Sequence, residues 1–429
     1  MREVYIVDGA RTPFLKARGK LGSFSASDLA VHAGKELLGR QPFSPQDLDE
    51  VVIGCVIPSA DETNIARVIA LRLGCGKTVP AWTVQRNCAS GMQALDSAMK
   101  DIATGRHDLV LAGGTEAMSR APFLFSDNMT NLYMGFLSAK NWKMKAKELA
   151  RFRPAYLMPV VALMKGLSDS LVNLSMGQTA ENLAYRFHIT REQMDQFALE
   201  SHQFTARAQD EHHFNNELLP VFSNRGDFYL TDDGLRRDTS LEKLKTLKPM
   251  FDRKFGNVTA GNSAQVTDGA ALLLLASKEA IQKYQLPVLA RIVDIEWAGV
   301  DPAEMGLGPV YATNELLRRQ NLQMDDINYW EINEAFAAQV LACIAAWESD
   351  DYCRKNLGRD QALGKLDRNK LNIDGGAVAL GHPVGASGAR IVLHLAQILR
   401  RQHAKKGVAT ICIGGGQGGA MLIENVTEV

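Results

Sequence analysis

The chain has 429 residues, more than a single hydrophobic core normally organises, so two or three packed units are expected. Its composition, 46% hydrophobic and 22% charged, is that of a globular protein without biased tracts. The 48 basic residues balance the 48 acidic ones, which argues against a nucleic-acid-binding protein but leaves an anionic small ligand open.

The first residues enter a strand-like apolar run at positions 4–7, and we therefore expect no presequence. No apolar run approaches the roughly 18 residues that span a bilayer. The cysteines form no CxxC pair and no metal-binding spacing with histidine; they are Cys55, Cys75, Cys88, Cys343, Cys353 and Cys412. These features predict free thiols in a reducing cytoplasm and no metal site.

Short runs rich in Val, Ile and Leu alternate with amphipathic stretches of helix length, which indicates an α/β protein with buried strands. In the first clear unit, residues 88–91 open a helix that Gly105 ends. The apolar positions of this helix fall on one face; they are Met92, Leu95, Met99 and Ile102. A strand at residues 109–112 then runs into Gly113 and Gly114.

The next segment, residues 119–249, has long polar helical stretches such as residues 192–209 and few strand-like runs. We interpret it as a loop domain inserted over the core, where binding determinants usually lie. Within it, residues 128–166 contain one acid, Glu148, and seven basic residues, a local charge of 7 − 1 = 6 positive; the basic residues are Lys140, Lys143, Lys145, Lys147, Arg151, Arg153 and Lys165. This patch adjoins an apolar run at residues 157–164.

The last part of the chain repeats the first unit. Residues 385–388 open a helix with Ile391, Leu395 and Ile398 on one face, and a strand at residues 408–413 runs into a triple glycine. Upstream, residues 327–333 resemble residues 48–54. Two copies of one α/β unit explain this pattern. We place the N-terminal half at residues 1–118 plus 250–277, the loop domain at 119–249 and the C-terminal half at 278–429.

Two residues stand at the starts of the repeated helices. Cys88 lies at the predicted first turn of its helix, where the helix dipole lowers a thiol pKa and favours a nucleophile; the alternative is a buried structural cysteine. His382 lies between small residues in what we expect to be a strand-to-helix loop, where a base is accessible to substrate; the alternative is a surface histidine in a turn. A duplicated fold would bring the two helix starts together.

Two further elements carry polar chemistry. Cys412 precedes a glycine-rich turn whose backbone N–H groups can hold an oxyanion, although such a turn can also be a plain connection. Asn333 and Glu334 form a polar pair where an apolar strand meets a helix, and an Asn there is often a helix cap.

Together these four elements resemble the thiolase family. Members carry, in this order, a Cys-x-Ser-Gly segment, an NEAF-type motif, a GHPxGxSG-type motif and a CxGGG motif, which this chain has at residues 88–91, 333–336, 381–388 and 412–416. Further similar segments are residues 7–14 (VDGARTPF), 113–119 (GGTEAMS), 257–262 (NVTAGN) and 267–270 (TDGA). The resemblance covers essentially the whole chain and implies the thiolase fold: duplicated α/β halves in a layered αβαβα arrangement with an inserted loop domain.

The resemblance also implies roles in an acyl transfer. Cys88 would attack the acyl group and hold it as a thioester, and His382 would take the proton of that thiol and polarise the thioester oxygen. Asn333 would hold a water beside His382, and Cys412 would move the proton at the substrate α-carbon. The backbone N–H groups of Cys88 and Gly414 would form a second oxyanion hole.

The same resemblance assigns coenzyme A as a substrate, with no permanently bound cofactor. The positions that match coenzyme A or substrate contacts of the family are Arg236, Phe251, Ala260, Ser263, Met176 and Phe336. Two departures concern the pantetheine channel. Short-chain members have a serine where this chain has Ala264, with Ser263 one place earlier, and a histidine where it has Ser175.

The motifs serve both directions of the reaction. Residues 128–166 look similar to the insertion of the thiolase subunit of the trifunctional fatty-acid oxidation complex, which favours degradative β-oxidation of medium or long 3-oxoacyl-CoA over biosynthesis of acetoacetyl-CoA. A decarboxylating 3-oxoacyl synthase would lack Cys412, and a non-catalytic acyl-binding protein would have lost at least one of the four polar groups. The resemblance implies a homodimer or tetramer. Residues 128–166 are expected to meet a hydratase/dehydrogenase subunit or, peripherally, an anionic membrane.

Overall fold

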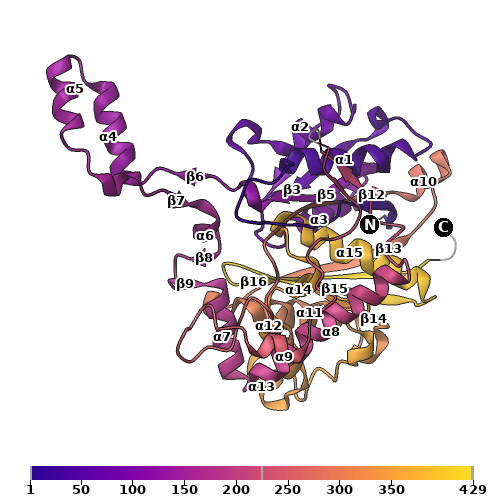
Figure 1. Cartoon of the computed structure of the whole chain (residues 1–429). Coiled ribbons are helices and arrows are strands. Elements are labelled where there is room, and N and C mark those ends of the chain that lie inside the picture. The colour runs from indigo at the N-terminus through magenta and orange to yellow at the C-terminus, as the bar shows by residue number, and fades with distance from the viewer. Residues whose placement is uncertain (1, 224–225, 427–429) are drawn as a thin grey trace.

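The computed structural model describes residues 2–223 and 226–426. In this part of the chain ten strands form one mixed sheet (Figure 1). The N-terminal half contributes β1 (Val4–Arg11), β2 (Leu15–Lys16), β3 (Glu50–Gly54), β4 (Ala81–Val84), β5 (Leu109–Ala117) and β12 (Thr267–Ala276). The C-terminal half contributes β13 (Ala290–Gly299), β14 (Tyr329–Ile332), β15 (Lys406–Ile413) and β16 (Gln417–Glu424).

The strand order shows the duplication directly. It runs β14-β15-β16-β13 and then β1-β12-β5-β3-β4, so that β13, β16, β15 and β14 mirror β1, β12, β5 and β3. The corresponding pairs also agree in direction: β3–β5 and β14–β15 are parallel, whereas β12–β5 and β16–β15 are antiparallel. The two half-sheets join where residues 4–6 of β1 pair with residues 290–292 of β13.

Five layers result, as the family resemblance implies. The helices α1 (Ala26–Gly39) and α2 (Ile65–Arg72) cover the outer face of the N-terminal half-sheet, and α11 (Gly308–Gln320) and α12 (Ala337–Glu348) cover that of the C-terminal half. Between the half-sheets lie α3 (Ser90–Ala103) and α15 (Val384–Arg401) (Figure 1). Residues 384–399 of α15 are all buried, because this helix contacts strands of both halves as well as α3.

The remaining helices are short or belong to the inserted segment. Outside that segment they are α10 (Lys278–Tyr284), α13 (Asp350–Asn356) and α14 (Ala377–Leu380). The inserted segment contains α7 (Met176–Arg186), α8 (Arg191–Asp210) and α9 (Leu241–Lys245), which pack on the C-terminal half. Its short strands are β8 (Ser168–Asp169), β9 (Leu174–Ser175), β10 (Val221–Phe222) and β11 (Phe228–Tyr229).

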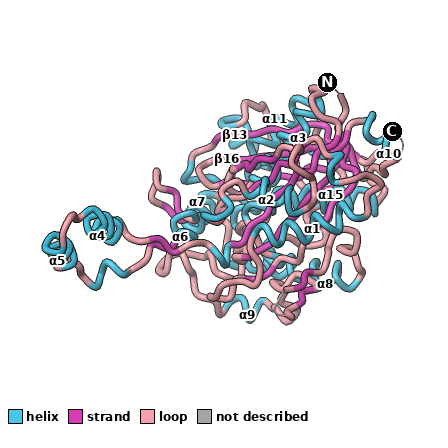
Figure 2. Tube along the Cα trace, turned by 90° about the horizontal axis from the view of Figure 1, so that it is seen from above, coloured by secondary structure: helices cyan, strands magenta, loops and turns pink. Residues whose placement is uncertain are grey.

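One part of the insertion leaves the body of the molecule. A two-stranded stalk, β6 (Phe123–Leu124) with β7 (Val160–Val161), carries a helical hairpin of α4 (Asp127–Ser138) and α5 (Trp142–Leu149), and α6 (Ala162–Gly166) follows it. We call residues 123–166 the arm. Figures 1 and 2 show α4 and α5 well away from the layered body. Among the described residues no helix has the length and apolar character needed to cross a membrane.

Candidate active site

Cys88 and His382 occupy equivalent positions in the two copies. Each lies two residues before the first residue of a central helix, Ser90 of α3 and Val384 of α15. One expectation was wrong: the segment before His382 is the short helix α14 and not a strand. The two helix starts approach each other through glycines. A Cβ on Gly91 would lie 2.9 Å from the backbone N of Ala389, and a Cβ on Gly388 would lie 2.6 Å from that of Met92.

His382 is arranged as a proton acceptor. Its backbone N–H donates to the carbonyl of Gln265, and its Nδ1 lies 2.6 Å from the hydroxyl of Ser387. That hydroxyl donates to the carbonyl of Pro383, so we assign the Nδ1–H as donor to Ser387, which leaves Nε2 unprotonated. Nε2 is buried and has no hydrogen-bond partner in the described structure. Burial, assisted by Arg390, lowers the pKa of His382 to about 3, so the imidazole is neutral at pH 7.

The thiol of Cys88 is half-buried, and one prediction about it was wrong. Burial raises its pKa above the ordinary value, whereas the helix position had suggested a lowered pKa. A hydrogen bond from the backbone N–H of Gly414 opposes the rise without cancelling it. Desolvation therefore outweighs the helix dipole, and Cys88 is a neutral thiol that needs a base before it can attack.

Cys412 approaches Cys88 from the other half. It lies near the end of β15 and is fully buried, and its pKa is raised well above the ordinary value by burial and then by Cys88. The turn that follows is held against the first half, because the amide of Asn87 donates to the carbonyl of Gly414 over 2.7 Å. Asn87 itself has a positive φ of 42°, which places it at the tight bend before Cys88.

Asn333 has unusual freedom for a buried amide. Its backbone N–H donates to Thr410, yet neither polar atom of its buried side chain has a hydrogen-bond partner among the described residues. Leaving such atoms unpaired costs about 1–3 kcal/mol each, so they mark a place for a water or a substrate oxygen. Asn333 is also not a helix cap, because α12 begins at Ala337 with Phe336 as its N-cap.

Glu334, the next residue, is buried in a set of donors. Its carboxylate accepts hydrogen bonds from Ser201, Asn372 and the backbone N–H of Val378. Burial raises its pKa, and these donors lower it in part. Glu334 thereby ties the segment after β14, which carries Asn333, to α8 and to the helix before His382.

Four of the six predicted substrate-contact residues form a series of contacts that begins beside Gly414. The sulfur of Met176 lies 3.2 Å from the position of a Cβ on Gly414. The ring of Phe251 packs on Gly177 and meets the ring of Phe336 edge-on, with centroids 6.0 Å apart. Ser263 pairs with Phe336 in an isolated β-bridge, and its hydroxyl donates to the carbonyl of Thr259. Met176, Phe251 and Phe336 form an apolar wall in the same core cluster as Cys412.

The other two predicted contacts, Arg236 and Ala260, are exposed. The backbone N–H of Arg236 donates to His202, and Gln265 donates to the carbonyl of Gly234 while its own carbonyl accepts from His382. The segment around Arg236 is therefore linked through Gln265 to the loop that carries His382. The departure at Ser175 also has a structural explanation, because its hydroxyl caps α7 by accepting from the N–H of Gln178.

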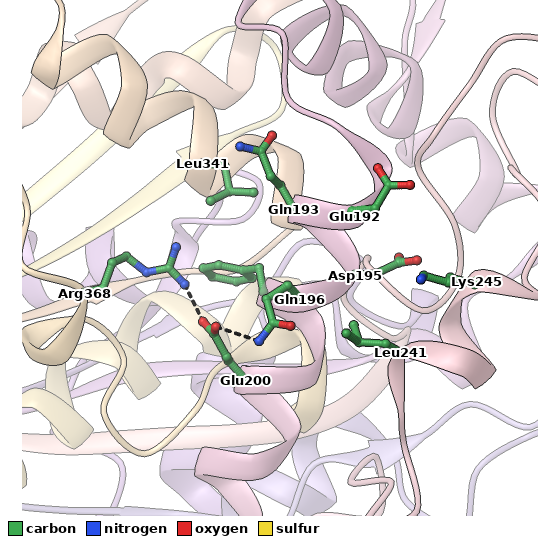
Figure 3. A pocket seen from close by; sticks show the side chains of 10 residues that line it. Glu192, Gln193, Asp195, Gln196, Glu200, Leu241, Lys245, Leu341 and Arg368 are labelled. Atoms are coloured by element: carbon green, nitrogen blue, oxygen red, sulfur yellow. Dashed lines mark hydrogen bonds and ion pairs between the residues drawn. The ribbon is translucent and has the colours of Figure 1, made fainter.

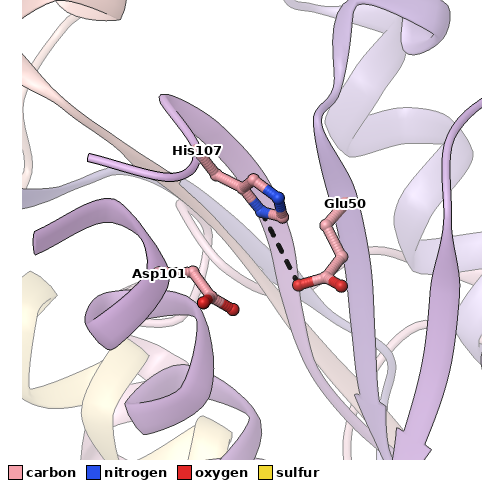
Figure 4. Close-up of side chains that lie close together, drawn as sticks. All are labelled: Glu50, Asp101 and His107. Carbon is pink, nitrogen blue, oxygen red and sulfur yellow. Dashed lines mark ion pairs between the residues drawn. The ribbon is translucent and has the colours of Figure 1, made fainter. Parts of the chain in front are cut away.

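Two other clusters contain none of the predicted site residues. A pocket lined by α8, α9 and Arg368 has an ion pair of 2.7 Å between Arg368 and Glu200 (Figure 3). At the end of α3 remote from Cys88, Glu50, Asp101 and His107 converge, with His107 3.7 Å from Glu50 (Figure 4). These three side chains lie close enough to one another to hold a metal ion, so the expectation of no metal site stays a prediction.

Three groups around the site were not singled out from the sequence: Ser387, Asn87 and Gln265. Ser387 lies inside the motif that carries His382, and its spacing of five residues from the histidine was the available signal. Asn87 is adjacent to Cys88, but its contact partner is more than 300 residues away in the chain. Gln265 has no sequence signal, because its partners are backbone groups of Gly234, Val378 and His382, which lie far from it in the chain.

Comparison with known proteins gives consistent matches. Family models described as the N-terminal and C-terminal domains of thiolase match residues 4–279 and 286–425. The chain is 38% identical to the mitochondrial 3-ketoacyl-CoA thiolase of Homo sapiens, with 99% of both chains covered. It is 40% identical to the β-ketoadipyl-CoA thiolase of Pseudomonas aeruginosa, with 99% of this chain and 100% of the relative covered.

Solved structures agree. The human mitochondrial 3-ketoacyl-CoA thiolase in complex with CoA matches with a TM-score of 0.84 and 37% identity over 99% of this chain and 98% of the other. The acetyl-CoA acetyltransferase of Bacillus anthracis matches with a TM-score of 0.86 and 36% identity over 99% of both chains.

Proposed function

The chain belongs to the thiolase family and is an acetyl-CoA acyltransferase, and from this premise we propose that it degrades medium or long 3-oxoacyl-CoA through an acyl-enzyme on Cys88. Coenzyme A is a substrate of this reaction and not a resident cofactor.

The proposed cleavage has two half-reactions. In the first, the Nε2 of His382 takes the thiol proton of Cys88, and the sulfur attacks the 3-oxo carbon. The bond between carbons 2 and 3 breaks, the acyl group stays on Cys88, and the departing acetyl-CoA carbanion takes the proton of Cys412. Before the second, the proton on His382 returns to the Cys412 thiolate. The Nε2 of His382 then takes the thiol proton of coenzyme A, whose sulfur attacks the acyl-Cys88 thioester, and passes that proton to the departing Cys88 sulfur as the shortened acyl-CoA leaves.

The observation that carries this proposal is the set of buried polar atoms of His382 and Asn333 that have no partner among the described residues, together with the backbone N–H that Cys88 receives. A neutral imidazole with an unpaired Nε2, an amide with two unpaired atoms and a backbone N–H at the thiol are the groups that acyl transfer needs. The base serves the nucleophile, and the remaining donors can hold the oxyanion of the tetrahedral intermediate. A pair of neutral thiols supplies a nucleophile from one half of the molecule and an acid from the other.

The degradative direction rests on the arm and on the substrate wall. Relatives include proteins named 3-ketoacyl-CoA thiolase and others named acetyl-CoA acetyltransferase, so names support both directions. The wall of Met176, Phe251 and Phe336 is apolar, and Ser175 is used as a helix cap. Both features suit an alkyl chain.

Cleavage of acetoacetyl-CoA and of a long-chain 3-oxoacyl-CoA should be compared. A higher kcat/KM for the long substrate supports the proposal, and the reverse result supports biosynthetic acetyl transfer.

We further propose that the arm binds an anionic, partly apolar surface, for which a membrane leaflet is the first candidate and a hydratase/dehydrogenase subunit the second. Leu137 and Trp142 at the hairpin tip are each 73% exposed. The lysines Lys143, Lys145 and Lys147 on α5 are exposed beside them. Apolar side chains together with cations are the combination that peripheral membrane helices use.

A further inference from the structure

Glu116 lies between the segment that carries Cys88 and the segment that carries His382, although it belongs to neither. It is near the C-terminal end of β5 in the N-terminal half, and its carboxylate is fully buried. The sequence places it in the GGTEAMS segment, for which the proposed mechanism has no role. Among the described residues it forms no ion pair, so only hydrogen-bond donors stabilise its charge.

Four donors converge on this carboxylate. The backbone N–H groups of Val56 and Ile57 donate over 2.9 and 3.0 Å, and the thiol of Cys55 lies at 3.6 Å. The fourth donor comes from the opposite half of the molecule: the backbone N–H of Gly385 lies 3.1 Å away. Backbone N–H groups directed at both carboxylate oxygens fix the orientation of the carboxylate.

The contact with Gly385 replaces a helix cap. Gly385 is the second residue of α15, and in the described structure this helix has no capping hydrogen bond from the side chain of its own N-cap residue. First-turn N–H groups are unpaired within a helix and favour a negative charge. Only glycine fits here, because a Cβ would lie 2.4 Å from the carbonyl oxygen of Thr115 and 2.8 Å from Glu116. His382 lies three residues before this contact.

The other contacts with Glu116 lead to Cys88. Residues 55–57 follow β3, and a Cβ on Gly54, the last residue of that strand, would lie 2.4 Å from the carbonyl carbon of Ser90 at the start of α3. The backbone N–H of Cys55 donates to Val84, the last residue of β4, which leads into the Cys88 turn. Glu116 therefore fixes the backbone beside the nucleophile and the backbone beside the base with one side chain.

We infer that Glu116 is a positioning residue that aligns Cys88 with His382 across the junction of the two halves. This inference rests on the proposed roles of those two residues. The electrostatics agree with it. Burial raises the pKa of Glu116 to about 7, and its donors oppose the rise. Burial is the main cause of the raised pKa of Cys88, and the Glu116 charge adds to it. Burial and the Glu116 charge also raise the pKa of Cys55, with a smaller contribution from Glu62.

Glu116→Gln tests the inference, because the amide nitrogen must face two donors whichever way the side chain turns. We expect kcat for thiolysis to fall about 100-fold, the loss typical of an ångström-scale misalignment, while KM changes little. The second measurement is alkylation of Cys88 by iodoacetamide at a series of pH values, mapped by peptide mass spectrometry. The pH midpoint of this alkylation should fall in the variant, because a negative charge near the thiol is gone.

Asp49→Asn is the matched control. Asp49 also accepts two backbone N–H groups, those of Asp108 and Leu109, but lies at the other end of β5. The Asp49→Asn variant should have the kcat and the pH midpoint of Cys88 alkylation of the wild type. If Glu116→Gln does not fold, Glu116→Asp keeps the charge but withdraws the oxygens, and should lower kcat without moving the midpoint.

Wild-type kcat in a folded Glu116 variant would overturn the inference, as would an unshifted alkylation midpoint in Glu116→Gln. Neither result affects the proposed function, which fails separately if Cys88→Ser retains turnover.

Discussion

Cys88 and Cys412 are the same residue type in different surroundings. Cys88 is half-buried and receives a backbone N–H from Gly414, whereas Cys412 is fully buried. Burial and then the nearby Cys88 raise the pKa of Cys412 well above its ordinary value, so it holds its proton at neutral pH. The first thiol is suited to bond with carbon and the second to give or take a proton.

Cys412→Ala should separate the two half-reactions. Acyl transfer to Cys88 should persist, because the nucleophile, its base and its oxyanion donors are intact. Formation and cleavage of the carbon–carbon bond should be lost, because the α-carbon has no proton partner. Exchange of labelled coenzyme A into acetyl-CoA measures the first activity and acetoacetyl-CoA formation the second. A variant that condenses acetyl-CoA at the wild-type rate would show that Cys412 is structural.

His382→Ala should abolish both activities together. The Nε2 of His382 is the proton acceptor for a thiol whose pKa is raised, and no other base serves that thiol in the proposed mechanism. A general base contributes about 10²–10⁴-fold, so coenzyme A exchange should fall by that factor. Exchange at the wild-type rate with lost condensation would assign His382 to the carbon–carbon step alone.

Sequence motifs point to the side chains of the proposed mechanism but not to their electrostatics. Cys88, Asn333, His382 and Cys412 each lie in a local pattern that can be seen without coordinates. The pKa direction of Cys88 was predicted incorrectly, since the helix start is visible in the sequence whereas its burial depends on the second half of the chain. Glu116 was missed for the same reason: its decisive partner, Gly385, is 269 residues away.

At the scale of elements, the strands and helices around the site were well anticipated. The strands at 4–7, 109–112 and 408–413 and the helix starts near 90 and 385 are observed. The spacing of apolar residues along the chain and the turn residues at each end determine such elements locally. α14 was missed because four residues are too few to show helical periodicity. The arm was predicted only as a basic segment beside an apolar run. Its projection from the body has no local sequence signal.

Replacing Lys143, Lys145 and Lys147 with Gln should weaken binding to anionic vesicles. Each lysine near such a surface contributes about 1 kcal/mol, so the triple variant should bind roughly 100-fold more weakly at low salt. Salt should weaken wild-type binding, because the Debye length is about 8 Å at physiological ionic strength. Cleavage of short soluble substrates should be unchanged. Vesicle flotation with and without anionic lipid measures the effect.

The matched control replaces three exposed lysines of the body, Lys35, Lys278 and Lys283, and should float like the wild type. If the wild-type protein never floats but co-purifies with a hydratase/dehydrogenase subunit, the second candidate surface is correct. If it does neither, the arm has no docking role and the degradative proposal loses its main support.

At the scale of the whole molecule, the duplication seen in the sequence organises the fold. The predicted layers are present, and the repeated units occupy equivalent places. The sequence did not indicate that the two half-sheets are continuous, because three residue pairs between β1 and β13 join them and register between distant strands leaves no local pattern.

The family resemblance leads us to expect at least a homodimer. Sedimentation velocity at micromolar concentration should give a species of twice the 47.0 kDa chain mass or larger. A single monomeric species at that concentration would contradict the expectation without affecting the proposed chemistry.

The identity of the acylated residue tests the central claim most directly. Wild-type protein mixed with acetyl-CoA, digested and analysed by mass spectrometry, should carry one acetyl group on the peptide that contains Cys88. Cys88→Ser should carry none and should not turn over, because an alkoxide is far harder to generate than a thiolate. Acetylation on the Cys412 peptide, or turnover by Cys88→Ser, would contradict the account.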